Sequence, residues 1–173
     1  MKKVLLINGN AKEEKREFDE YCSELLSIVK DQENEVREIK LKEKEIADCI
    51  GCYACWLKTP GICAIHDDQE EILKGYTWAD FIVLASPLSM GFVSALLKKS
   101  YDRIIPLVHP FLRLNDGRMA HYPRYDNEYK IGVLLDHAGK DDIEIITKVF
   151  GKAVFIKTMA QSAKEVANEI NNF

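Results

Sequence analysis

Lys3-Val4-Leu5-Leu6-Ile7-Asn8-Gly9-Asn10 is a short apolar run that ends in a turn signal. It predicts a buried β-strand over residues 3–7 that enters a loop. Working outward, a partly alternating run at 35–41 is typical of an edge strand. Further apolar runs predict strands at 81–85, 130–135 and 153–156. We therefore expect the chain to be built around a five-stranded sheet.

Helical periodicity separates these strands. Apolar residues recur at three- and four-residue steps in segments at about 18–30, 67–76, 93–104, 141–150 and 159–170. A strand–helix alternation repeated in this way indicates an α/β fold, with a parallel sheet covered by helices on both faces. The chain has 173 residues and no linker-like segment. We therefore expect a single domain over residues 1–173.

Residues 106–128 interrupt this alternation. Leu112-Arg113-Leu114 and Met119-Ala120-His121 flank Asn115-Asp116-Gly117, and this pattern predicts a β-hairpin. An excursion of this length inside a domain is typical of a lid or a subunit contact. A plain surface insertion is an equally good interpretation.

Composition excludes several classes of protein. The formal net charge is −4, so the basic surplus that nucleic-acid binding requires is missing, and no nucleic-acid partner is expected. The apolar stretch at residues 4–7 is too short for a signal peptide, and no run approaches the roughly 20 residues that span a bilayer. We therefore expect a cytoplasmic protein with no membrane partner. In that reducing compartment, clustered cysteines indicate metal or redox chemistry instead of disulfides.

Four of the five cysteines lie in one short run, at Cys49, Cys52, Cys55 and Cys63. Two successive C-x-x-C steps and a fourth thiol form a possible four-thiolate ligand set, as an iron-sulfur cluster requires. Zinc also accepts four thiolates, although its paired knuckles usually have longer spacers, and free thiols are a third interpretation. The fifth cysteine, Cys22, lies on the apolar face of the helix expected at 18–30, which is typical of a buried core residue.

The loops that follow the first four strands should share one rim of the sheet, because ligands bind beyond the carboxyl ends of parallel strands. The cysteine run lies in the second of these loops. The first loop carries one glycine, Gly9, so the spaced glycines of a dinucleotide-binding turn are missing. Such a loop can still hold a phosphate with its backbone N–H groups and the following helix N-terminus.

Several segments together resemble a known family. They are Ile7-Asn8-Gly9, the cysteine run followed by Asp67-Asp68, Ala79-Asp80, Ser86-Pro87-Leu88 and Ser94…Lys98…Asp102-Arg103. As a set they resemble the flavodoxin-like NAD(P)H-dependent FMN reductases, and within that group the iron-sulfur flavoproteins. The resemblance covers nearly the whole chain. It implies a flavodoxin-like doubly wound five-stranded parallel sheet in the order 2-1-3-4-5, assembled as a homodimer or homotetramer in which a neighbour's residues lie near the flavin.

The resemblance also implies a set of binding residues. Gly9, Asn10, Ala11 and Lys12 would face the FMN phosphate, and Pro87, Leu88, Ser89, Met90 and Gly91 would line the flavin ring, with His137 in contact with flavin or substrate. A four-iron four-sulfur cluster would be held by Cys49, Cys52, Cys55 and Cys63. The chain departs from the family pattern at residues 10–17, where no Ser or Thr hydroxyl is present to bind the phosphate.

The function that these features predict is an FMN-dependent oxidoreductase or electron-transfer flavoprotein. It would take electrons from NAD(P)H and pass them to a small electron acceptor, which could be a quinone, azo or nitro compound. The alternative is a flavodoxin-fold protein with a degenerate FMN site, acting as a metal or thiol redox sensor or as a partner-binding protein.

Overall fold

The computed structural model describes residues 1–115 and 117–173. Its central sheet has five parallel strands in the order β2-β1-β3-β8-β9. The strands are β1 (Lys3–Asn8), β2 (Glu35–Lys40), β3 (Phe81–Ser86), β8 (Lys130–Leu135) and β9 (Ala153–Thr158). Counted along the chain, these five strands have the order 2-1-3-4-5. The predicted flavodoxin-like fold is therefore confirmed.

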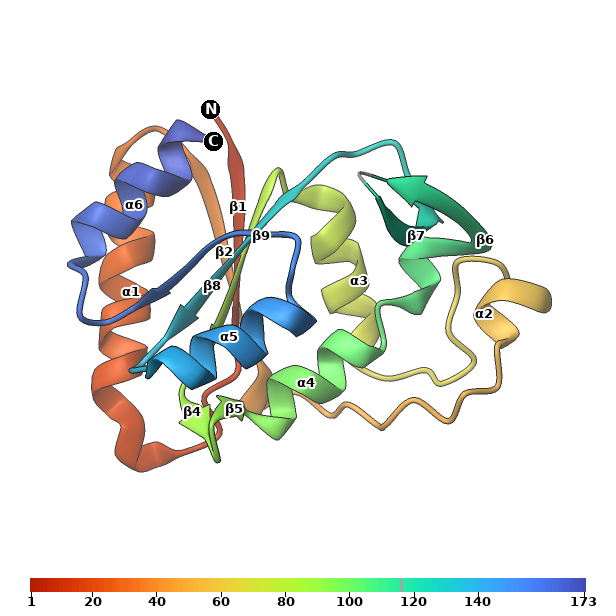
Figure 1. Ribbon diagram of the computed structural model, residues 1–173, viewed down its shortest axis with the longest axis horizontal. Helices are drawn as coiled ribbons and strands as arrows, with labels where there is room; N and C mark the ends of the chain where they lie inside the picture. Colours follow the sequence, from red (N-terminus) through yellow and green to blue (C-terminus); the bar gives the residue numbers. More distant parts are fainter. Residues whose placement is uncertain (116) are drawn as a thin grey trace.

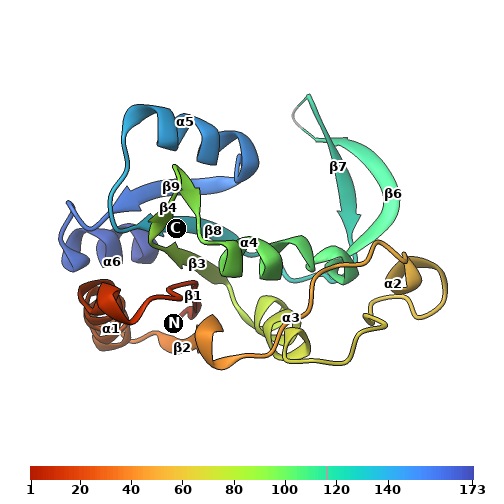
Figure 2. The same ribbon diagram turned by 90° about the horizontal axis from the view of Figure 1, so that it is seen from below.

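Helices cover both faces of the sheet (Figures 1 and 2). One face carries α1 (Arg16–Asp31) and α6 (Ala163–Asn172), and the other carries α3 (Gln69–Trp78), α4 (Ala95–Asp102) and α5 (Lys140–Val149). Successive side chains of a strand point to opposite faces, so Leu5 and Leu6 enter two separate cores. Cys22 lies in the α1–α6 core and is fully buried. Its expected place in the core is confirmed.

Parallel register brings the carboxyl ends of the central strands to one edge of the sheet. Asn8 at the end of β1 lies opposite Ala85 of β3, and Ser86 lies opposite Leu135 of β8. Just beyond the edge, the N–H of Gly9 donates to the carbonyl of Ala85 at 2.8 Å. The loops after β1, β3 and β8 therefore meet at this edge.

The excursion at 106–128 contains the predicted hairpin. A short 3₁₀ turn, η3 (Ile105–Leu107), leads into β6 (Val108–Asn115), which pairs antiparallel with β7 (Arg118–Pro123). Asp116, in the predicted turn, lies outside the described residues. Arg124 holds the base of the hairpin closed, because its side chain donates to the carbonyls of Pro106 and Val108. Both views show the hairpin standing away from the sheet, beside the short helix α2 (Ala54–Leu57).

Several short elements were not predicted. Two-residue strands β4 (Leu88–Ser89) and β5 (Phe92–Val93) form a small ribbon, and segments this short show no readable periodicity. The 3₁₀ turns η1 (Glu13–Lys15) and η2 (Leu41–Glu43) were not predicted either, and the same holds for η3 and α2. Over residues 1–115 and 117–173, no helix has the length and apolar character needed to cross a membrane.

Candidate functional site

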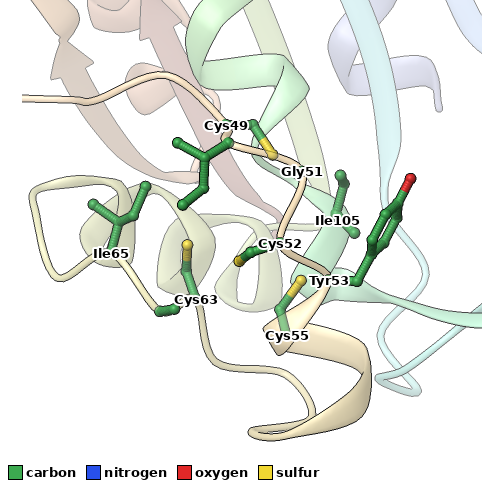
Figure 3. Close-up of a pocket in the computed structure, with 10 residues that line it drawn as sticks. Cys49, Gly51, Cys52, Tyr53, Cys55, Cys63, Ile65 and Ile105 are labelled. Carbon is green, nitrogen blue, oxygen red and sulfur yellow. The ribbon is translucent and has the colours of Figure 1, made fainter.

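All four clustered cysteines line one pocket (Figure 3). Its remaining lining residues are Ile50, Gly51, Tyr53, Ala64, Ile65 and Ile105. Cys49 and Cys52 are exposed, whereas Cys55 and Cys63 are half-buried. Figure 3 shows Cys49, Cys52 and Cys55 on one arm of the loop and Cys63 on the returning arm. The structure thus brings together the four thiols that the sequence groups.

Left-handed backbone turns shape this pocket. Gly51 and Tyr53 have φ values of 64° and 54°, so the chain turns sharply between Cys49 and Cys55 before α2 begins. Gly61 has a φ of 86° and its N–H donates to the carbonyl of Cys55 at 3.0 Å. This bond returns the second arm beside the first. Glycine adopts positive φ without strain, which explains why a glycine stands at this turn before Cys63.

The donor set fits a metal cluster in its chemistry. Thiolate sulfurs are the ligands that iron-sulfur clusters prefer. Burial raises the pKa of the Cys55 thiol, and the nearby Cys63 sulfur raises it further. Within residues 1–115 and 117–173, no group of three or more His, Cys, Asp or Glu side chains has a metal-binding arrangement. The thiols therefore share a pocket wall, and ligation requires them to turn toward a common centre.

Trp56 attaches the cysteine loop to the base of the hairpin. Its indole Nε1 donates to the carbonyls of Ile105 and Val108 at 3.2 and 3.0 Å. Its ring stacks on Tyr53 and contacts His121, with centroid distances of 5.5 and 5.1 Å. We predicted no role for Trp56 from the sequence. A tryptophan inside a cysteine motif could have indicated a contact between this loop and another segment, because an indole N–H that leaves solvent needs a hydrogen-bond partner.

The cysteine pocket does not lie on the rim that the other loops share, contrary to our expectation. In both views, α4 lies between the β4–β5 ribbon at the sheet edge and the short helix α2 of the cysteine loop. At its beginning, Ser94 donates to the carbonyl of Gly9 at 2.7 Å. Just after its end, Arg103 donates to Cys63 Sγ at 3.3 Å. The eight residues of α4 span about 12 Å at 1.5 Å per residue, so the long loop after β2 carries the thiols away from the sheet edge.

The residues expected to face a phosphate differ in exposure. Gly9 and Asn10 are buried, whereas Ala11 and Lys12 are exposed. A Cβ on Gly9 would lie 2.7 Å from the Cβ of Leu97, so close packing against α4 requires glycine there. The N–H of Lys12 donates to Asn10 Oδ1 at 3.0 Å. That backbone donor is therefore already used inside the loop.

The residues expected to line a flavin ring form the ribbon of β4 and β5. Pro87 is buried and Leu88 is half-buried, while Ser89 and Met90 are exposed. Met90 and Gly91 have φ values of 52° and 77° and make the turn between the two short strands. Met90 therefore stands at the tip of the ribbon with its side chain in solvent, at the edge where β1, β3 and β8 end.

Asp136 connects the loops at this edge. Its Oδ1 accepts hydrogen bonds from the backbone N–H groups of Leu88 and His137, both at 2.8 Å, and its Oδ2 pairs with Lys15 Nζ at 2.7 Å. Burial alone would raise the pKa of Asp136, but these hydrogen bonds lower it below its ordinary value. The imidazole of His137 is largely exposed. Asp136, which we did not single out from the sequence, thus holds the Leu88 amide and Lys15 in one ion-paired network.

A five-stranded parallel sheet in this order, with loops gathered at its carboxyl edge, defines the flavodoxin-like class. Residues 2–120 match the family model described as NADPH-dependent FMN reductase. The match covers more than half of the chain, so the chain belongs to that family.

Two relatives that match about half of the chain are named as iron-sulfur flavoproteins. An iron-sulfur flavoprotein of Methanocaldococcus jannaschii is 45% identical over 84 residues, which are 49% of this chain and 42% of the relative. An iron-sulfur flavoprotein of Methanosarcina thermophila is 34% identical over 82 residues, which are 47% of this chain and 42% of the relative. The chain thus matches less than half the length of either relative.

Solved structures share the fold at low sequence identity. An azoreductase from Bacillus anthracis superimposes with a TM-score of 0.66 at 15% identity, covering 100% of both chains. An NAD(P)H:quinone oxidoreductase from Methanothermobacter marburgensis gives a TM-score of 0.64 at 13% identity, covering 96% of this chain and 93% of that one. At such identities the likeness concerns the fold alone.

Proposed function

We propose that the protein is an NAD(P)H-dependent flavoprotein oxidoreductase that binds FMN at the carboxyl edge of its sheet and an iron-sulfur cluster on its cysteine loop. The observation that carries this proposal is that four thiols line one pocket in a chain of the FMN reductase family. The relatives named as iron-sulfur flavoproteins support it. The acceptor is a small molecule, for which a quinone, an azo compound and a nitro compound are the candidates.

FMN, when bound, supplies two-electron chemistry with a nicotinamide and one-electron chemistry with other partners. The residues that would hold it belong to the loops that meet at the sheet edge. Ala11 and Lys12 are exposed at the first loop, and the ribbon of residues 88–93 and exposed His137 flank the edge from β3 and β8. The cluster would be held by the four thiols of the cysteine loop.

We infer that a second copy of the chain covers the β6–β7 hairpin, giving a homodimer or homotetramer. Phe111, Leu114 and Met119 of this hairpin are at least two-thirds exposed. A two-stranded ribbon by itself is marginally stable in water, and an exposed apolar surface of this kind is typical of a protein contact. Because Trp56 ties the cysteine loop to the hairpin base, a partner on the hairpin would also lie near the cysteine pocket.

The proposal is tested on anaerobically purified protein reconstituted with FMN, iron and sulfide. We expect a spectrum with both flavin and cluster absorption, and oxidation of NADH or NADPH that depends on added FMN. Titration calorimetry measures FMN binding directly. A protein that shows no heat of FMN binding would rule out the flavoprotein function.

A second candidate function is a thiol or metal redox sensor in which the FMN site is degenerate. The observation that favours it concerns Asp136. Its carboxylate already accepts hydrogen bonds from Lys15 Nζ and the Leu88 N–H, two donors that an FMN site could use. The segment 10–17 also lacks hydroxyl groups. In this function the cysteine loop would respond to metal or oxidant without flavin chemistry.

Asp136→Asn is expected to tighten FMN binding by about tenfold, which corresponds to roughly 1.4 kcal/mol. The amide can still accept from Leu88 and His137, but it releases Lys15 and removes one negative charge near the place proposed for the phosphate. The measurement is the Kd of FMN by calorimetry, with riboflavin as the matched ligand because it lacks the phosphate. Riboflavin affinity should stay unchanged. Weaker FMN binding by the variant would mean that Asp136 supports the site instead of competing with the phosphate.

A further inference from the structure

Arg103 is a buried charge that reaches the cysteine loop. Its side chain is 1% exposed, although it stands just after the last turn of α4. Its Nη1 donates to the carbonyl of Ala47 and to the carboxylate of Asp67, and its Nη2 donates to the carbonyl of Ile65 and to Cys63 Sγ, both at 3.3 Å. One guanidinium thus contacts four groups of one loop.

These contacts lie at both ends of the cysteine run. Ala47 precedes Cys49 by two residues, and Ile65 follows Cys63 by two residues. Asp67 joins the same two ends directly, because its Oδ2 accepts the N–H of Ala47 at 2.9 Å. We call residues 45–48 and 65–68 the neck of the cysteine loop. Arg103 and Asp67 together hold the neck closed.

The chemistry of Arg103 explains why a charge is buried here. A buried guanidinium is costly unless it is paired and hydrogen-bonded, and Asp67 supplies the ion pair. The planar fork of arginine can bond several acceptors at once in fixed directions. One N–H is thereby aimed at Cys63 Sγ. This bond from a charged donor is directed at one of the four sulfurs of the pocket.

We propose that Arg103 is a positioning residue for the cysteine loop. It closes the neck, holds the Cys63 arm against the pocket, and keeps a hydrogen bond on the Cys63 sulfur when that sulfur ligates a cluster. The last part rests on the proposed function, whereas closure of the neck does not. Hydrogen bonds to ligand sulfurs help to set the reduction potential of a cluster, so Arg103 makes the potential more positive than it would otherwise be.

Arg103→Lys tests the proposal because it keeps a positive charge for Asp67 and loses the fork. In metal-free protein, we expect faster hydrogen exchange at the amides of residues 45–68, and the Ala47 amide is the diagnostic one. In reconstituted protein, we expect a more negative midpoint potential. We also expect a chelator to remove iron about tenfold faster, since lost partners of metal ligands typically weaken binding by that factor or more.

Ser100→Ala is the matched control. Ser100 is also buried on α4, and its Oγ donates to the side chain of Gln69 of α3 at 3.1 Å, so its loss weakens the fold while every side-chain bond of Arg103 and Asp67 stays in place. This variant should keep wild-type exchange at residues 45–68 and a wild-type potential. If Arg103→Lys does not fold, the double variant Arg103→Gln with Asp67→Asn replaces the ion pair by a neutral polar pair, and the same three measurements apply.

The outcomes separate this inference from the proposed function. Wild-type protein that assembles no cluster would overturn the cluster assignment, and faster neck exchange in Arg103→Lys would still support the closing role. A reconstituted variant with wild-type exchange, potential and iron release would overturn the role of Arg103 while leaving the proposed function intact. Changes of equal size in Ser100→Ala would show a general effect of destabilisation and would also overturn it.

Discussion

Cys52→Ser is expected to abolish iron binding and to leave the protein folded. Cys52 is exposed and its sulfur belongs to the pocket wall instead of either core, so the fold loses little packing. The substitution removes one of the four thiolates proposed to bind the cluster. Loss of an outer partner of a metal ligand already weakens metal binding by about tenfold or more. Loss of a direct ligand should weaken it further, so we expect the iron and sulfide content per chain to fall by more than about tenfold. Metal and sulfide analysis after anaerobic reconstitution measures this.

Cys22→Ala is the matched control for that experiment. It removes the one cysteine that lies in the hydrophobic core, where it is fully buried. We expect this variant to retain wild-type iron and to be less stable, which is the opposite pattern to Cys52→Ser. Stoichiometric zinc in wild-type protein would favour a structural zinc site. Full iron content in folded Cys52→Ser would contradict the four-thiolate assignment.

Asp67→Asn is expected to lower the free energy of unfolding by about 3 kcal/mol at neutral pH, the lower end of the range for breaking a buried ion pair. The variant leaves the guanidinium of Arg103 buried without its counter-charge, and the side chains of the wild-type pair are only 1% and 12% exposed. Urea unfolding at several pH values measures the loss.

The stability lost in Asp67→Asn should be larger at neutral pH than at acidic pH, because the ion pair needs an ionised carboxylate. Burial alone would raise the pKa of Asp67, but hydrogen bonds from Arg103 and from the N–H groups of Ala47 and Gln69 lower it below 3.8. A carboxyl group whose pKa is lower in the folded state stabilises the fold above its unfolded pKa, and this stabilisation disappears as the pH falls through the folded pKa. The difference between wild type and Asp67→Asn should therefore be full at neutral pH and should narrow below about pH 4.

Asp102→Asn is the matched control for the ion pair. Asp102 pairs with Lys98 on the surface of α4, where the two side chains are 50% and 36% exposed. Exposed i, i+4 pairs contribute about 0.5 kcal/mol or less, so the free energy of unfolding of this variant should stay within about 0.5 kcal/mol of wild type at every pH. An equal loss in both variants would contradict a special role for the buried pair.

The regular elements were predictable because their signals are local. Runs such as Phe81–Ala85 are apolar throughout since both faces of a central parallel strand are buried, and the matching strand in the structure ends one residue later, at Ser86. The hairpin was predictable from its turn residues. The ribbon at Leu88–Val93 and the short helix α2 were not, because such short segments show no period.

The candidate sites were predictable only in part. The spacing of the cysteines indicates four thiols that can meet, and the structure places all four around one pocket. The same spacing does not show where that pocket lies. The β2–α3 loop is long enough to leave the sheet edge, and Arg103 and Trp56 attach it beyond the far end of α4. These contacts join residues that are 40 and 49 positions apart, so no local pattern contains them.

The amino-acid order by itself determined the α/β class, the position of each main strand and helix, the single-glycine first loop and the grouping of the thiols, because each depends on neighbours within a few residues. Tertiary structure alone decided three other features. Helix α4 separates the cysteine pocket from the sheet edge, and the ion pair of Arg103 with Asp67 closes the neck of the cysteine loop. The third feature is the ion pair between Lys15 and Asp136. The physical reason is that buried charges must find partners wherever the fold brings them, and those partners lie far away in the sequence.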